Sequence, residues 1–532
     1  MAQARQSTEN TGRHAVLVAA GILASRLIGL VRQRVFSHFF GLSDTADAFS
    51  SALRVPNILQ NLFGEGVLSA SFIPVYARLH AQGDEHEADR VAGAVGSLLA
   101  LAMACIVLIG VLATPALLWL IAPGYSGAKR ELTILLVRIL FPGTGLLVCS
   151  AWCLGILNSH RKFFLSYAAP VLWNLAMIVT MVLFRHARQE SLAIWLAWGT
   201  VLGAALQFGV QLPTTLRLAR HLRLSLDLRS EHVREVVRNF GPVVFSRGVV
   251  QISSYVDQAL ASLLGEGAMA AMTTAASINM LPVSLFGMAV SAAELPAMSR
   301  ALGQDAHVLD AQASEALRTR LDAGLRRIAF FIVPSAMAFF ALGDVITAAL
   351  FQSGRFTHAH TLYVWGIIAG SGVGLLASTL GRLYASTFYA LRDTRSPLRF
   401  ALVRLTLTTG LGIPCALWLP SALGLSVRWG AAGLTASAGV AGWVEFTLLR
   451  ARLNRRIGVT GLPARFTAKL WASALAAAGI AWALKGALPP GNPILLALMV
   501  LGLYGLSYFA ATYLVRVDEC AGVVRRVLRF KR

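Results

Sequence analysis

Residues 92–121 read AGAVGSLLALAMACIVLIGVLATPALLWLI, an apolar run that contains no charged side chain. A helix of about 20 apolar residues crosses the ~30 Å hydrocarbon core of a bilayer. Comparable runs recur along the whole chain. The predicted spans cover residues 15–40, 46–77, 92–121, 132–158, 164–184, 192–215, 239–264, 268–299, 328–351, 360–391, 400–420, 429–449, 470–484 and 493–515. The sequence therefore predicts an all-α, polytopic membrane protein with about fourteen transmembrane helices.

The composition of the chain agrees with this class. Its 532 residues are 56% hydrophobic and only 14% charged, and the mean hydropathy is +0.65. Soluble domains carry about 25% charged residues, so a set of soluble domains is excluded, as is a disordered chain.

The five cysteines are scattered and predict no metal site. The P-loop, zincin and nucleophile-elbow motifs are missing from the sequence, which predicts a transporter without nucleotide hydrolysis and without a cofactor. A coupling ion, the membrane potential or the cargo gradient would then supply the energy.

The formal net charge of +22 is explained by membrane topology. One alternate set of predicted loops, together with both termini, carries 32 Lys and Arg residues, whereas the opposite set carries 7. Loops that stay in the cytoplasm are enriched in Lys and Arg, so both termini are expected to be cytoplasmic. The charge then needs no nucleic-acid partner.

A weak internal repeat divides the chain. Ser25-Arg26 recurs as Ser246-Arg247, and the triplet at 62–64 recurs at 285–287, with nearly the same offset. Six spans per repeat predict two parallel lobes, an arrangement typical of transporters. The predicted segments are a lobe over 1–220, a lobe over 221–452 and a C-terminal part over 453–532 with two helices and a basic cytoplasmic tail. Residues 303–327, with apolar positions every four residues, predict an amphipathic helix on the membrane surface.

Charged residues inside the spans are the best candidates for function, because each costs about 2.5–3.5 kcal/mol to insert. They concentrate on the first, second, seventh and eighth spans, the equivalent pairs of the two repeats. We expect a hydrated cationic cavity in which arginines clamp phosphate or carboxylate groups of the cargo. The alternative is that the arginines pair with nearby acids and only hold the lobes together. The charged candidates are Arg26, Arg32, Arg54, Asp47, Glu65, Arg247, Asp257 and Glu294.

The stretch ASRLIGLVRQRVFSHFFGLSDTADAFSSALRVPNILQNLFGEGVLSASFIPVYARL, residues 24–79, resembles the start of the MurJ (MviN) lipid II flippases. So do GILNSHRKFFLSYAAPVLWN at 155–174, FGMAVSAAELPAMSR at 286–300 and FYALRDTRSP at 388–397. The family belongs to the multidrug, oligosaccharidyl-lipid and polysaccharide exporter superfamily. The resemblance implies alternating access that carries lipid-linked peptidoglycan precursor from the cytoplasmic to the periplasmic leaflet, for cell-wall synthesis and cell shape. It also implies a groove for the polyprenyl tail beside the last two helices.

The resemblance and the span pattern together assign roles. Substrate binding is expected from Ser25, Arg26, Arg32, Arg54, Asn57 and Arg247. Charge pairing that changes between states is expected from Asp47, Glu65, Asp257 and Glu294. Bending of the second span is expected at Pro56, Gly64 and Gly66.

Two departures from the family pattern bear on the cargo. Gln60 and Asn61 stand where the family commonly has a basic residue or pair, and Ala276 and Ser277 stand where it commonly has an Asp-Arg pair. The expected function is a lipid II flippase of the bacterial inner membrane, whose partners are lipid II, membrane lipids and cell-wall synthesis proteins. The alternatives are a flippase for another polyprenyl-pyrophosphate oligosaccharide, or a non-transporting membrane scaffold for cell-wall enzymes.

Overall fold

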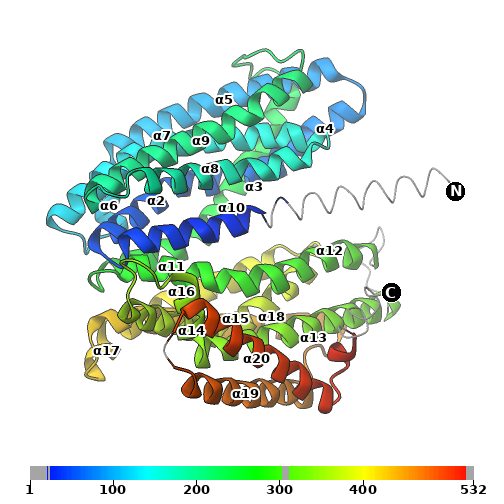
Figure 1. The fold of residues 1–532 in the computed structure, drawn as a ribbon. Coiled ribbons are helices and arrows are strands. Elements are labelled where there is room, and N and C mark those ends of the chain that lie inside the picture. Colours follow the sequence, from blue (N-terminus) through cyan, green and yellow to red (C-terminus); the bar gives the residue numbers. More distant parts are fainter. Residues whose placement is uncertain (1–20, 22–23, 302–310, 490, 523–532) are drawn as a thin grey trace, which may run out of the picture. The chain divides into compact units, whose positions relative to one another are not determined.

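The computed structural model of the chain describes residues 21, 24–301, 311–489 and 491–522. Throughout this part of the chain the regular structure is helical (Figure 1). Twelve of its helical segments are long and apolar enough to cross a membrane. The other two predicted spans correspond to the helix over 24–40, whose predicted start is not described, and to α10. The all-α, polytopic class predicted from the sequence is confirmed.

The chain forms two compact units, Met1–Ala270 and Ala271–Arg532. The first contains α2 (Asp44–Phe63), α3 (Glu65–Ser71), α4 (Ile73–Ala81), α5 (Glu85–Leu112), α6 (Thr114–Ile121), α7 (Gly127–Ser159), α8 (Phe163–Leu183), α9 (Gln189–Leu218) and α10 (Glu231–Ser262). Helix α11 (Ala268–Pro282) begins in the first unit and continues into the second. The second contains η1 (Val283–Met288), α12 (Ala289–Ala301), α13 (Ala311–Ala341), α14 (Gly343–Phe351), α15 (His358–Ala390), α16 (Arg395–Ile413), η2 (Pro414–Trp418), α17 (Leu419–Ala422), η3 (Val427–Trp429), α18 (Gly430–Ile457), α19 (Ala464–Ala487) and α20 (Pro493–Leu514).

The same order of packing recurs in both units, as the repeat predicts. In the first unit, α7 lies at the centre and packs against α2, α5 and α9, while α8 packs on α9. In the second unit, α15 lies at the centre and packs against α12, α13 and α18, while α16 packs on α18. The last two helices, α19 and α20, pack on each other and on α13 and α14.

The two compact units group the predicted segments by their contacts. Residues 221–270 group with the first unit, in which α10 packs on α2, α3 and α5. Helices α19 and α20 group with the second unit. The lobe boundaries at 220 and 452 stay a prediction.

The predicted surface helix over 303–327 also differs from the structure. Residues 302–310 lie outside the described part, and residues 311–327 form the first half of the continuous helix α13. Leu317, Leu321 and Leu325 are fully buried. The four-residue spacing of leucines therefore marks a helix face that packs against protein in the second unit.

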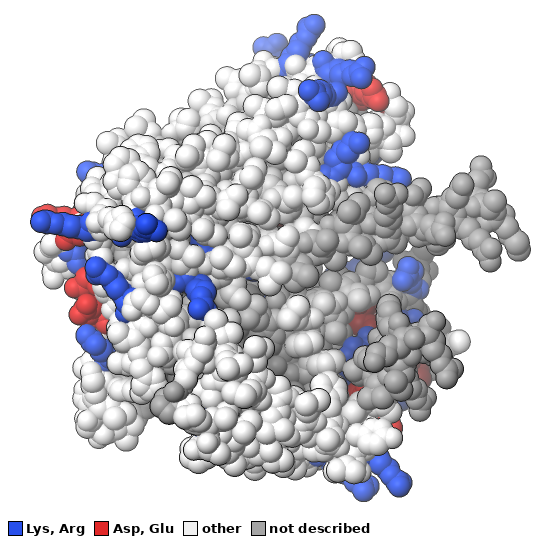
Figure 2. Space-filling model, viewed as in Figure 1, with Lys and Arg blue, Asp and Glu red and all other residues white. Residues whose placement is uncertain are grey.

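Charge is distributed as expected of a protein in a bilayer. In the view of Figure 2 most of the visible surface is uncharged, and the Lys, Arg, Asp and Glu side chains gather mainly towards the ends of the helices. Exposed large apolar side chains lie between those ends, for example Leu108, Leu112 and Trp119 on α5 and α6, and Leu498 and Leu506 on α20. An apolar band of this kind is stable only against lipid.

Candidate functional site

The start of α2 is set by its own sequence. Ser43 is the N-cap, and its hydroxyl accepts a hydrogen bond from the backbone N–H of Ala46 at 3.2 Å. Asp44 and Asp47 lie in the first turn, where the helix dipole favours negative charge. The two carboxylates have different surroundings, because Asp44 is exposed whereas only 1% of the Asp47 side chain is exposed.

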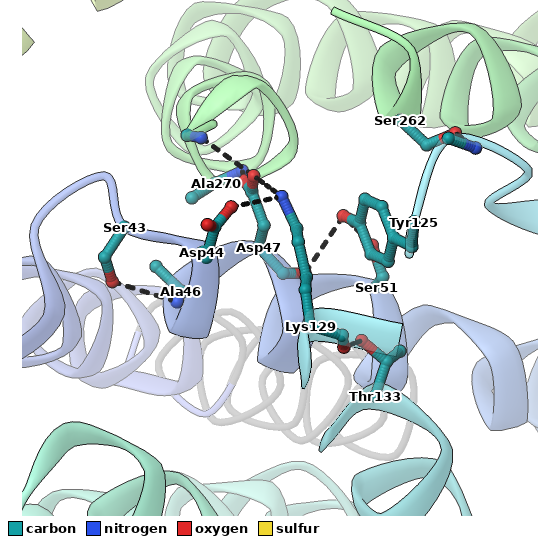
Figure 3. Close-up of polar contacts among 12 residues, drawn as sticks. Ser43, Asp44, Ala46, Asp47, Ser51, Tyr125, Lys129, Thr133, Ser262 and Ala270 are labelled. Atoms are coloured by element: carbon teal, nitrogen blue, oxygen red, sulfur yellow. Dashed lines mark hydrogen bonds and ion pairs between the residues drawn. The ribbon is translucent and has the colours of Figure 1, made fainter. Parts of the chain in front are cut away.

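Asp47 joins the beginnings of three helices (Figure 3). Its carboxylate contacts the ammonium group of Lys129, at the start of α7, at 2.7 Å. It also accepts hydrogen bonds from the backbone N–H groups of Gly267 and Ala270, each at 2.8 Å, at the start of α11. A buried carboxylate is tolerated when charge and hydrogen bonds both compensate it, and here they do. We call Asp47, Lys129, Gly267 and Ala270 the Asp47 clasp.

The surroundings of the clasp hold its parts in place. Lys129 lies over the ring of Tyr125 at 4.4 Å and also pairs with Asp44 at 2.8 Å. The Tyr125 hydroxyl is hydrogen-bonded to Ser51 at 2.8 Å and donates to the backbone carbonyl of Asp47 at 3.4 Å. Gly267 has φ +79°, and a Cβ there would stand 2.7 Å from the carbonyl oxygen of Leu42. Only glycine fits this position, so the start of α11 can approach α2 closely.

The sequence indicated Asp47 but not its partners. Lys129 is one of only 7 Lys and Arg residues in the predicted periplasmic loops, and this rarity is the one signal in the sequence that points to it. The other partners of Asp47 are backbone N–H groups more than two hundred residues away, which no side-chain pattern reveals.

The predicted arginines lie in different surroundings. Arg26 is exposed on the helix over 24–40. Arg32, on the same helix, packs against α8, with its guanidinium 5.4 Å from the ring of Trp173. Arg54, on α2, lies within electrostatic range of Asp257 on α10. The backbone of Arg247 belongs to α10, and its side chain lies outside the described part.

The other predicted charge partners lie as follows. Glu294 on α12 pairs with Arg320 and Arg327 of α13, at 3.9 and 3.6 Å, within the second unit. Its expected exchange of partners between states stays a prediction. Glu65 is exposed at the start of α3.

The predicted bend of the second span has a defined place. Pro56 lies inside α2, and the helical path is interrupted at Gly64, between α2 and α3. A Cβ at Gly64 would stand 2.2 Å from the carbonyl oxygen of Gln60. A larger residue would therefore change the angle between the two helices. Gly66 follows within α3, and Asn57 is half-buried on α2.

Solved structures share this fold. A structure described as an inward-facing conformation of a multidrug resistance MATE family transporter of the MOP superfamily aligns with a TM-score of 0.67 and 19% identity, over 83% of this chain and 98% of the other. A structure described as lipid II flippase MurJ, inward closed conformation, aligns with a TM-score of 0.78 and 21% identity, over 94% and 98%. The chain thus shares the fold of these two structures, and its described part has the apolar helices of a polytopic membrane protein.

The family follows from the sequence comparisons. The family model described as lipid II flippase MurJ matches residues 36–502. The protein of Burkholderia cenocepacia named lipid II flippase MurJ is 32% identical over 481 residues, which cover 88% of this chain and 89% of the relative. A probable lipid II flippase MurJ of Rhizobium tropici is 31% identical over 97% of this chain and 96% of its own length. This chain belongs to the MurJ family.

Proposed function

We propose that this chain moves lipid II, a lipid-linked peptidoglycan precursor, from the cytoplasmic to the periplasmic leaflet of the bacterial inner membrane by alternating access. The observation that carries the proposal is the family match over residues 36–502, with relatives named lipid II flippase that span nearly the whole chain. The twelve apolar helices and the transporter fold support it. Transport would proceed without nucleotide hydrolysis by this chain.

The Asp47 clasp is the proposed element with two states. Alternating access needs a contact that is made in one conformation and broken in the other. Asp47 ties α2 and α7 to the first turn of α11, which is the helix that continues into the second unit. With both termini cytoplasmic, as the Lys and Arg distribution predicts, the start of α2 is periplasmic. We infer that the clasp is made in one state of the transport cycle and broken in the other.

The cationic residues are the proposed binding groups for the cargo. Arg26 and Arg32 lie on the helix over 24–40, and Arg54 lies on α2, about two turns after Asp47. Guanidinium groups bind pyrophosphate and carboxylate through paired hydrogen bonds. Arg247, Ser25 and Asn57 complete the proposed set. Asp257, within electrostatic range of Arg54, would hold that arginine when the cargo is absent.

The experiment replaces the flippase of a bacterium depleted of its own and scores both growth and periplasmic exposure of labelled lipid II. The wild-type chain should restore both. Asp47→Asn, Arg26→Ala and Arg32→Ala should restore neither, at equal amounts of inserted protein. Asp44→Asn is the matched control, because Asp44 shares Lys129 but is exposed, and it should restore both.

A second cargo is favoured by one observation. Ser277 stands where the family commonly has an arginine, and its hydroxyl donates to the carbonyl of Thr274 on its own helix. Gln60 likewise brings no charge. If the expressed wild type restores neither growth nor lipid II exposure, a different polyprenyl-pyrophosphate oligosaccharide becomes the better assignment. If the charge variants all restore growth, a non-transporting scaffold replaces the flippase.

A further inference from the structure

Three charged side chains meet inside the membrane helices of the second unit. Arg404 on α16 pairs with Glu445 on α18, with Nη1 and Oε2 3.1 Å apart. Arg382 on α15 lies within electrostatic range of both. From the sequence, Arg382 and Arg404 are each isolated on their spans. We call Arg382, Arg404 and Glu445 the intramembrane triad.

Helix packing brings the triad together. Helix α18 packs against both α15 and α16, which brings Glu445 of α18 close to arginines on both neighbouring helices. Arg382 and Arg404 lie about 12 and 14 Å along their helices from the turn that joins α15 to α16. Both arginines are therefore more than two helical turns inside spans that are otherwise mainly apolar. Arginines on membrane-spanning helices commonly contact a partner, a ligand or the lipid head groups.

The charges of the triad do not balance. Two guanidinium groups lie within electrostatic range of one carboxylate, and only that of Arg404 pairs with it, which leaves one positive charge in excess. The excess lies at the surface of the unit, because the Arg404 side chain is 41% exposed and that of Glu445 is 18% exposed. Arg382 is also exposed.

Apolar side chains are exposed on the same three helices. They are Tyr389 on α15, Leu402 and Val403 on α16, and Val440 and Trp443 on α18. A cationic centre on helices with exposed apolar side chains suits an amphiphile that has an anionic head and hydrocarbon chains.

We propose that the intramembrane triad binds the phosphate group of a lipid, whose chains lie on the surrounding apolar surface. Two planar guanidinium groups can each donate a pair of hydrogen bonds to phosphate oxygens. Glu445 forms an ion pair with Arg404 when the lipid is absent. The carboxylate therefore competes with the lipid phosphate for this guanidinium group, and the bound lipid stays exchangeable. This phosphate chemistry is common to membrane phospholipids and to polyprenyl pyrophosphates. The proposal does not depend on lipid II transport.

The test is lipid retention by the purified full chain in detergent, measured by native mass spectrometry. The probes are phosphatidylglycerol, a polyprenyl pyrophosphate and diacylglycerol, which has no phosphate. Arg382→Gln combined with Arg404→Gln should lower retention of the phosphate lipids about tenfold, whereas Glu445→Gln should raise it about threefold. Arg138→Gln, at an exposed arginine within α7, is the matched control and should change nothing.

The arginine variants and Glu445→Gln should change lipid retention in opposite directions. If the ion pair were merely structural, both kinds of variant would lower retention, so the experiment separates binding from structure. Arg382→Gln alone leaves the Arg404–Glu445 pair intact and gives a second reading if the double variant is poorly folded. Retention of both phosphate lipids would identify bulk phospholipid as a ligand, and retention of the pyrophosphate alone would identify the polyprenyl pyrophosphate as the ligand. Unchanged retention in the arginine variants, equal retention of diacylglycerol, or loss in Glu445→Gln would overturn the proposal. Lipid II transport is scored separately, so failure of one does not imply failure of the other.

Discussion

Replacing Asp47 with asparagine tests the clasp, because it changes charge with almost no change in volume. The carboxylate receives the Lys129 ammonium and two backbone N–H groups. An asparagine keeps one acceptor oxygen. Its NH₂ group is itself a donor, so it cannot accept a hydrogen bond from the Lys129 ammonium or from the backbone N–H groups. Hydrogen bonds to charged groups contribute about 1.5–3 kcal/mol each, so we expect a loss of about 3 kcal/mol. That loss lowers the population of the clasped state about 100-fold relative to the open one.

Hydrogen exchange of the Gly267 and Ala270 amides in detergent measures this population. In Asp47→Asn both amides should exchange about 100-fold faster than in the wild type. In Asp44→Asn the change should stay below about fivefold, because an exposed ion pair contributes at most about 1 kcal/mol. Equal exchange rates in the two variants would refute the role given to Asp47.

Three further predictions concern single positions. Gly267→Ala should lower the thermal unfolding temperature and speed α11 amide exchange, because φ is +79° and the added Cβ meets Leu42; unchanged exchange would contradict this. Gly64→Ala should reduce transport while the protein still inserts, because its Cβ clashes with the preceding helical turn; full transport would show that the interruption is not needed. Burial, and to a smaller extent the neighbouring His80, lowers the pKa of His160 below its ordinary value of 6.5. As the pH falls, this histidine is therefore protonated in the unfolded chain before it is protonated in the folded protein. The stabilisation is therefore complete above about pH 6.5 and declines below it; thermal unfolding at pH 5.5 and 7.5 should show this, and His160→Gln should flatten it.

The helices could be predicted because apolar length and turn residues are local signals. The run at 92–121 falls within α5 and α6, and Ser43 caps α2 where the sequence changes from turn to helix. Helices α7 and α15 are the central helices of the two units, and they are equivalent in the weak internal repeat of the sequence.

The partners of the charged residues could not be predicted, because they depend on tertiary packing. Asp47 was found as a buried charge, yet Lys129 comes from a helix eighty-two residues later in the chain. Glu294 pairs with Arg320 and Arg327 on the adjacent helix, partners that no pattern in the sequence indicates.

The lobe boundary and the intramembrane triad depend on packing in the same way. Nothing in the sequence of α10 shows that it packs on α2 and α3. The pairing of Arg404 with Glu445 requires α16 and α18 to be neighbours, which a span pattern does not specify.

The central claim is that this chain moves lipid II. The most direct measurement reconstitutes the purified chain into vesicles with labelled lipid II and follows how fast the label becomes accessible to a membrane-impermeant reagent. The wild-type chain should clearly accelerate this exposure over protein-free vesicles, Asp47→Asn should lose the acceleration, and Asp44→Asn should keep it. Accessibility that rises no faster with the wild-type chain than without protein would contradict it.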